Sequence, residues 1–168
     1  MSLPIQQVDE NDYPIGSTTK QEAWDNGHIH RVVRIMLEDG RGNVLLQHRD
    51  PAKDIFPDCW DNSSAGHVDA GEDYDEAAMR ELAEELGIKK AELNELGKYR
   101  SDETWKGHRF NRFTKCYRAF IVRTPVPQEP GKIDGVKWFS IDDAKLLVED
   151  QPDQVSDGLR QVLNNYYS

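Results

Sequence analysis

The chain of 168 residues has little cysteine and no long apolar run. Its two cysteines, Cys59 and Cys116, are too few for a disulfide framework or a zinc knuckle, which favours a reducing compartment. No apolar stretch approaches the roughly 20 residues of a membrane span, and residues 1–12 lack the basic and apolar regions of a signal peptide. We therefore expect a cytoplasmic protein that does not bind membranes.

Basic side chains are also in short supply. Lys and Arg number 21 against 31 Asp and Glu, so the formal net charge is -10. A surface that coats a nucleic-acid polymer needs a basic stripe, which this balance argues against. A small molecule remains as the expected partner, and the sequence leaves a homodimer open. The length suits one domain over residues 1–168.

Acidic residues are abundant, and three of them share one helical face. In the run GHVDAGEDYDEAAMRELAEELGI, residues 66–88, Glu81, Glu84 and Glu85 stand at i, i+3 and i+4. Like charges at this spacing repel one another, and a hard cation such as Mg²⁺ or Mn²⁺ would explain why they are gathered there. The alternative is a solvated acidic helix.

The ends of this helix are marked in the sequence. Asp73 with Glu76 forms an Asp version of the capping box, and Gly87 followed by an apolar residue is a C-terminal stop signal. The pattern predicts a helix from Tyr74 to Leu86. Its opposite face carries an apolar stripe for packing, namely Ala78, Met79, Leu82 and Leu86.

The same segment resembles, position for position, the Nudix box of the Nudix hydrolase superfamily. The matching residues are Gly66, Glu72, Arg80, Glu81, Leu82, Glu84, Glu85, Gly87 and Ile88. The resemblance implies an α/β/α sandwich with a mixed sheet and a loop-helix-loop box. It also implies a metal site of Glu81, Glu84 and Glu85 with Gly66 and Glu72, in which Arg80 orients the glutamates.

From about Val8 to Gly71 the chain is similar to type I isopentenyl diphosphate isomerase, a branch of this superfamily. The shared runs are VDENDYPIG, HRVVRI, LLQHR, AKDIFPDCWDNSSAGH and GE. The resemblance places Arg49 and Lys53 where the isomerase holds its diphosphate, and a guanidinium with an ammonium suits that ligand. The alternative is two surface cations on a polar loop, residues 49–57.

The isomerase pattern fails at the residues that carry its chemistry. Ala65 stands where the catalytic cysteine is expected, Trp24 replaces one metal-binding histidine, and residues 112–116 lack the expected carboxylates. His30 and His67 match the other two metal histidines, although a structural role for them is the alternative. The frame is isomerase-like, whereas the intact box predicts hydrolysis.

We therefore predict a divalent-metal-dependent hydrolase that cleaves the diphosphate of a nucleoside diphosphate-X or a related small organic diphosphate. An isomerase and a non-catalytic diphosphate sensor remain as alternatives. The sequence does not identify the general base, because Lys132 stands where many family members have a glutamate. The candidates for that base are Glu81, Asp102, Glu103, Glu129 and Asp134.

The remaining elements follow from apolar periodicity and turn residues. We expect strands at Ile5–Asp9, Ile29–Leu37, Val44–Gln47, Leu93–Ser101, Thr114–Val122 and Gly135–Phe139, and helices at Ile141–Glu149 and Gln154–Tyr166. A loop between the fourth and fifth strands is expected to hold Trp105, Lys106, His108, Arg109 and Phe110. These aromatic and basic residues suit either stacking on a substrate or burial in the core.

Overall fold

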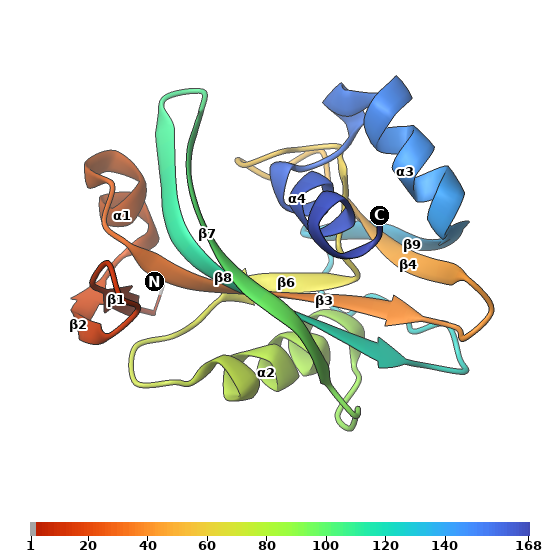
Figure 1. Ribbon diagram of the computed structural model, residues 1–168, viewed down its shortest axis with the longest axis horizontal. Helices are drawn as coiled ribbons and strands as arrows, with labels where there is room; N and C mark the ends of the chain where they lie inside the picture. The colour runs from red at the N-terminus through yellow and green to blue at the C-terminus, as the bar shows by residue number, and fades with distance from the viewer. Residues whose placement is uncertain (1–2) are drawn as a thin grey trace.

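A computed structural model describes residues 3–168 as a mixed sheet with helices on both faces (Figure 1). The strands are β1 (Ile5–Val8), β2 (Pro14–Thr18), β3 (His30–Glu38), β4 (Asn43–Arg49), β5 (Trp60–Asp61), β6 (Ser64–His67), β7 (Asn94–Trp105), β8 (His108–Phe120) and β9 (Ile133–Ser140). The helices are α1 (Lys20–Asn26), α2 (Tyr74–Leu86), α3 (Ile141–Asp150) and α4 (Asp157–Tyr166), with a 3₁₀ turn η1 (Pro152–Gln154).

Strand β3 organises the sheet. It pairs in parallel with β8 and antiparallel with β1, β4 and β6. Beyond these neighbours, β2 extends β1, β7 extends β8, and β5 and β9 extend β4. Because β4 touches β3 only near residues 37–38, the short strand β6 pairs with the middle of β3.

The two faces of β3 pack into two different apolar cores, because successive side chains of a strand point in opposite directions. Val33, Ile35 and Leu37 pack with the apolar stripe of α2 in one core. Met36 packs with α3 and α4 in a second core on the other face. This three-layer arrangement confirms the expected α/β fold with a mixed sheet.

Helix α2 has the predicted ends. Asp73 accepts a hydrogen bond from the backbone N–H of Glu76, and the Glu76 side chain accepts one from the backbone of Asp73. Gly87 adopts a left-handed conformation with φ of 68°, which a glycine tolerates without steric cost. The prediction of a helix over Tyr74–Leu86 is confirmed.

The expected loop around Trp105 is wrong. Strands β7 and β8 form one long hairpin, and its turn consists of Lys106 and Gly107, both with positive φ. Two such residues give the turn that joins tightly twisted strands. Polar cross-strand pairs such as Asp102 with Asn111 hide the alternation that would have revealed these strands in the sequence.

Other differences from expectation concern element boundaries and two missed elements. Arg49 is the last residue of β4 and lies outside the polar loop. The final helix begins at Asp157, because Ser156 caps it and a 3₁₀ turn precedes it. Helix α1 and strand β2 were not expected from the sequence. Among residues 3–168, no helix is long and apolar enough to cross a membrane.

Candidate functional site

The predicted metal ligands lie where α2 packs against β6. Glu81 points at Gly66, and a Cβ atom at position 66 would lie only 2.2 Å from the Glu81 carboxylate. Only glycine leaves room there. Strand β6 therefore forms one wall of a carboxylate site and α2 the other.

Glu85 is fixed by the same strand. Its Oε1 accepts hydrogen bonds from the Ser64 hydroxyl at 2.5 Å and from the Ala65 backbone N–H at 3.0 Å. Both donors bind the same oxygen, so Oε2 is free of these two contacts. Among residues 3–168, Glu85 forms no ion pair with a basic side chain.

The pKa values of both carboxylates are raised above the usual range of a glutamate. Burial raises the pKa of Glu81 above its usual range, although the Arg80 guanidinium opposes this. Burial also raises the pKa of Glu85, and the neighbouring Glu81 raises it further. Two adjacent buried carboxylates of this kind fit a divalent cation, because the cation compensates both charges.

The third glutamate points elsewhere. Glu84 is largely exposed, and its Oε2 accepts a hydrogen bond of 3.2 Å from Arg80. Over the described residues 3–168, no three His, Cys, Asp or Glu side chains are arranged to hold a metal ion. The structure thus brings Glu81 and Glu85 together, whereas Glu84 would have to leave Arg80 to join them.

Arg80 connects the box to its loop. Its guanidinium binds both oxygens of Glu72 at 2.8 and 3.0 Å, and it also donates to Glu81 at 2.8 Å and to the His67 carbonyl at 2.9 Å. The orienting role of Arg80 stays a prediction, which these contacts allow. Glu72 contacts Arg80 and the backbone of Asp69, so its place is beside the carboxylate pair.

Three lysines from different segments interact electrostatically with the pair. Lys20 begins α1, Lys53 lies between β4 and β5, and Lys132 directly precedes β9. Burial lowers the pKa of Lys53, and the charge of Glu85 partly offsets this. The hydrogen bond that Lys132 donates to Glu129 raises the pKa of Lys132, and the charges of Glu81 and Glu85 raise it further. The charge of Lys20 lowers the pKa of Glu81 and so partly opposes the effect of burial.

Sequence reasoning selected only Lys53 from this set as a binding residue. Lys20 was missed together with its helix, although Thr19 accepts a hydrogen bond from Glu22 and Gly27 ends α1. That spacing was the available signal. Lys132 was noticed only because it occupies the position of the family's glutamate.

The Arg49 side chain contacts other groups of the protein. Its guanidinium donates to the carbonyls of Ile55 and Phe56 at distances of 2.6 to 3.0 Å, and Nη1 lies 3.3 Å from the buried Asp61. These contacts fold back the segment that contains Lys53. Its predicted role as a diphosphate ligand stays a prediction.

His30 and His67 lie on the face of β3 and β6 opposite to α2. Their rings stack with centroids 5.5 Å apart, and Trp24 approaches His67 at 6.2 Å. The hairpin adds His108 and Phe110, whose rings lie 5.6 and 6.0 Å from Trp24. Burial lowers the pKa of both His30 and His67, so both imidazoles are neutral at pH 7.

The acids proposed as general base are spread over the molecule. Asp102 pairs with Arg109 at 2.6 Å on the outer side of the hairpin, and Glu103 lies 3.4 Å from Arg160. Asp134 lies 3.2 Å from His48. Glu129 accepts a hydrogen bond of 2.7 Å from Lys132, whose pKa is also raised by the charges of Glu81 and Glu85. Of these candidates, Glu81 belongs to the carboxylate pair itself, and Glu129 is linked to the pair only through Lys132.

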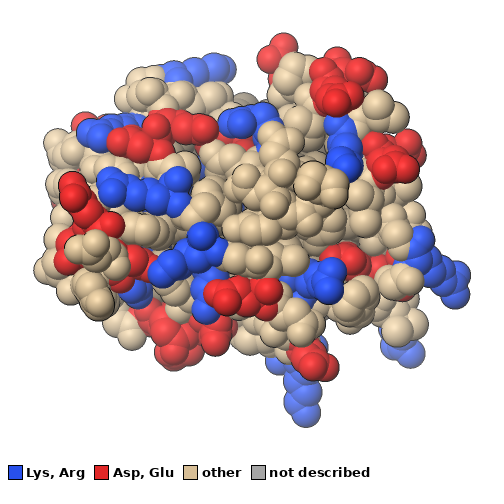
Figure 2. Space-filling view, in the orientation of Figure 1, with Lys and Arg blue, Asp and Glu red and all other residues tan. Residues whose placement is uncertain are grey.

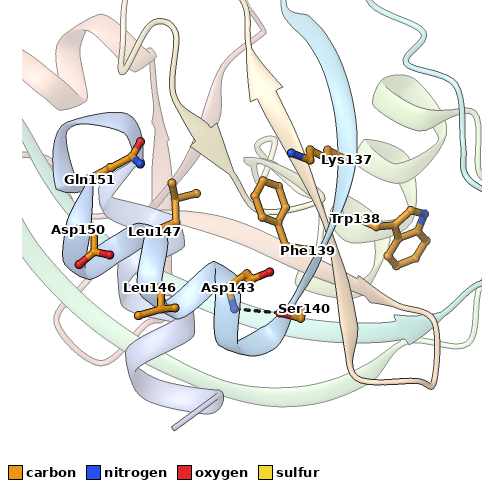
Figure 3. Close-up of a pocket in the computed structure, with 9 residues that line it drawn as sticks. All are labelled: Lys137, Trp138, Phe139, Ser140, Asp143, Leu146, Leu147, Asp150 and Gln151. Atoms are coloured by element: carbon orange, nitrogen blue, oxygen red, sulfur yellow. Dashed lines mark hydrogen bonds between the residues drawn. The ribbon is translucent and has the colours of Figure 1, made fainter.

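A cleft of about 350 Å³ lies elsewhere, between β9 and α3. In Figure 3, Phe139 and Leu147 face each other across it, while Trp138 points away. It contains no residue of the box. On the face seen in Figure 2, basic and acidic side chains of the described residues alternate without a continuous basic band.

The mixed sheet carries on one face the helix α2 with its two adjacent buried glutamates. The family model described as the NUDIX domain matches residues 28–162. The chain belongs to this family.

Its relatives fall into two groups. An isopentenyl-diphosphate Delta-isomerase of Nocardia farcinica is 32% identical over 96% of this chain and 93% of its own length. An uncharacterised Nudix hydrolase of Pseudomonas aeruginosa is 42% identical over 59% of each chain. The crystal structure of the protein DR0079 from Deinococcus radiodurans matches with a TM-score of 0.79 and 24% identity, covering 98% of this chain and 99% of that one.

Proposed function

We propose that this protein is a Mg²⁺- or Mn²⁺-dependent hydrolase that cleaves the diphosphate linkage of a nucleoside diphosphate-X or a related small organic diphosphate. The observation that carries this proposal is the pair of adjacent buried carboxylates, Glu81 and Glu85, with which the charges of Lys20, Lys53 and Lys132 interact. The carboxylates suit a divalent cation, and the lysines suit the phosphate oxygens that such a cation also binds. A purely structural acidic helix would not need cations from three separate segments.

In this reaction the lysines, the metal and a carboxylate have separate roles. Lys20, Lys53 and Lys132 bind phosphate oxygens and offset their charge. When bound, Mg²⁺ or Mn²⁺ supplies a Lewis acid that polarises phosphate oxygens and acidifies a water molecule. Glu81 or Glu129 accepts the proton of the attacking water, while the bond between phosphorus and the bridging oxygen breaks.

A substrate panel tests this proposal. Nucleotide sugars, dinucleotides, nucleoside triphosphates and prenyl diphosphates are incubated with Mg²⁺ and, separately, with Mn²⁺, and the products are resolved by phosphorus NMR. We expect at least one compound to be cleaved into two phosphate-bearing products at a rate that depends on the metal. The proposal fails if no compound is cleaved with either metal.

An isomerase is the second candidate, because a relative with that name is similar over nearly the whole chain. Ala65 argues against it, since its methyl group offers neither a nucleophile nor an exchangeable proton. NMR of isopentenyl diphosphate incubated with the protein and Mg²⁺ separates the two functions. Formation of dimethylallyl diphosphate at a catalytic rate would replace our proposal, whereas Ala65→Cys should create no isomerisation.

A further inference from the structure

Strand β7 forms a long unpaired edge of the sheet. Among residues 3–168 it pairs only with β8, and it crosses in front of β8 and β3 in Figure 1. It has 12 residues, whereas the edge strands β2 and β9 have five and eight. Strand β2 also begins with Pro14, which makes an edge a poor partner for pairing. Since a long unpaired edge is a template for another strand, β7 is a candidate interaction surface.

The free backbone groups of this edge follow from the hairpin turn. The turn consists of Lys106 and Gly107, so Trp105 and His108 form the closing, hydrogen-bonded pair. Hydrogen-bonded pairs alternate along an antiparallel ladder, and the odd-numbered residues of 97–105 therefore bond to β8. The even-numbered residues direct their N–H and C=O groups away from β8. These are Lys98, Arg100, Asp102 and Thr104, whose side chains share one face of the strand and are all exposed.

The charges on this face select one register for a second copy of the chain. In a twofold dimer that continues the sheet antiparallel, the axis is perpendicular to the sheet, so the exposed faces of the two strands lie side by side. An axis at Arg100 or at Asp102 would set like charges opposite each other, and an axis at Tyr99 would oppose Lys98 to Arg100. An axis at Ser101 instead pairs Arg100 of each copy with Asp102 of the other.

We propose that β7 is a homodimer interface, in which two copies join antiparallel through residues 97–105 with Ser101 at the twofold axis. Arg100 and Asp102 exchange backbone hydrogen bonds across the axis, and Lys98 does so with Thr104. The exposed ion pairs add little energy and mainly fix the register. A strand edge buries less than the roughly 1,600 Å² of a standard interface, so the dimer is weak and depends on concentration.

Sedimentation velocity on the unmodified protein gives the first test. Measured from low to high micromolar concentration, the sedimenting mass should rise from that of one chain towards that of two. A protein that stays monomeric at high micromolar concentration overturns the proposal. This readout needs no substrate and no metal, so it is independent of the proposed hydrolysis.

Two charge reversals test the register. In Arg100→Asp alone, or in Asp102→Arg alone, like charges face each other twice across the axis, and self-association should weaken about tenfold or more. Mixed in equal amounts, the two variants should associate again, because opposite charges then face each other at both positions. Self-association of wild-type strength in either variant, or no association of the mixture, would contradict the register.

A matched control separates the interface from net charge. Arg123→Asp makes the same charge change at an exposed residue beyond β8, and it should dimerise like the wild type. If it weakens the dimer as much as Arg100→Asp does, net charge and not the β7 edge governs association.

Thr104→Pro tests the backbone contact. Proline removes an N–H that points away from β8, so the hairpin ladder and Tm should be largely retained. The dimer loses one hydrogen bond in each copy and should weaken about tenfold or more. A dimer of wild-type strength in this variant would show that the strand edge is not used.

Amide hydrogen exchange covers variants that fail to fold, because it uses the unmodified protein. Raising the protein concentration should slow exchange at Arg100, Asp102 and Thr104, while the amides of β2 keep their rates. If a dimer forms without slowing exchange at these three residues, the interface lies elsewhere and the proposal is wrong.

Discussion

Two groups of buried charge lie on opposite faces of β3, and they differ in how they are compensated. Towards α4, Asp61 lies 3.8 Å from Arg34 and 3.3 Å from Arg49 and also accepts from Ser156, while Arg112 pairs with Asp157 at 2.9 Å. We call this group the ion-pair network.

Towards α2, the carboxylate pair has no comparable set of neighbouring guanidinium groups. Glu81 shares a single guanidinium with two other glutamates, and Glu85 has only a hydroxyl and a backbone N–H. Protein folding alone favours the first arrangement, because unpaired buried charge is costly. The carboxylate pair is therefore best explained by a ligand that completes it, and the ion-pair network by stability.

The largest effect is expected for Glu85→Gln. If Glu85 binds the catalytic cation, kcat should fall by about 10³ or more, as when several kcal/mol of Lewis-acid stabilisation are lost. The fold should persist, since glutamine is nearly isosteric and relieves repulsion from Glu81. Steady-state kinetics and circular dichroism provide the two measurements.

Thermal melting supplies the corresponding binding test. Millimolar Mg²⁺ or Mn²⁺ should raise the Tm of the wild type by preferential binding to the folded state, and should do so much less in Glu85→Gln. Glu92→Gln, an exposed glutamate beyond α2, should behave like the wild type. Full activity in Glu85→Gln would end the metal assignment.

Arg49→Ala should break the ion-pair network. Removing one partner of a buried ion pair costs about 3 kcal/mol or more, because Asp61 keeps its charge with less compensation. Urea unfolding should show this loss. A variant as stable as the wild type would show that Asp61 does not depend on Arg49.

Lys53→Met is the contrasting variant. It leaves Asp61 untouched, so stability should barely change. The loss of one charge-assisted contact of about 1.5–3 kcal/mol should lower kcat/KM by roughly one to two orders of magnitude. If Lys53→Met hydrolyses the best substrate as well as the wild type, the diphosphate contact is wrong.

The dependence of stability on pH should also separate the two groups. Burial raises the pKa of Glu81 to about 7 and that of Glu85 to about 8, from an ordinary value of 4.5. A raised carboxylate pKa means that the folded state binds protons more tightly than the unfolded state. Without metal, the free energy of unfolding should therefore fall as pH rises through this range.

The range above pH 6.5 is the informative one. Below it, His30, whose pKa is lowered to about 4, is protonated more readily in the unfolded chain and opposes the trend. Between pH 6.5 and 8.5, urea unfolding should show a slope of up to about 1.4 kcal/mol per pH unit for each proton. Glu85→Gln should flatten that slope. A wild-type slope equal to that of the variant would contradict the carboxylate coupling.

Local signals in the sequence predicted the box well. The caps at Asp73 and Gly87 and the i, i+3, i+4 glutamates depend on neighbours within one helix, so α2 and its two faces could be derived. The same holds for most strand positions, because apolar alternation marks them. The hairpin around Trp105 was not predicted, because its cross-strand pairs are of mixed polarity and hide the apolar alternation.

Long-range geometry could not be derived. Whether Arg49 meets a ligand or Asp61 depends on how β4 and β5 pair. The convergence of Lys20 and Lys132 on one site likewise requires segments more than 100 residues apart to meet. That His30 and His67 stack on each other likewise depends on the register of β3 and β6, which the sequence does not show.

The smallest expected effect compares two adjacent serines. Ser64 donates to Glu85 Oε1, so Ser64→Ala should loosen that carboxylate while the Ala65 N–H still holds it. One lost hydrogen bond of about 1 kcal/mol should weaken Mn²⁺ binding roughly fivefold, with kcat at saturating metal largely retained. Ser63 instead bonds the backbone of Leu37 and Leu45 inside the sheet. Ser63→Ala should therefore lower Tm without changing Mn²⁺ affinity. Calorimetry would measure Mn²⁺ affinity and melting would measure Tm for both variants. The assignment would be reversed if only Ser63→Ala weakened Mn²⁺ binding.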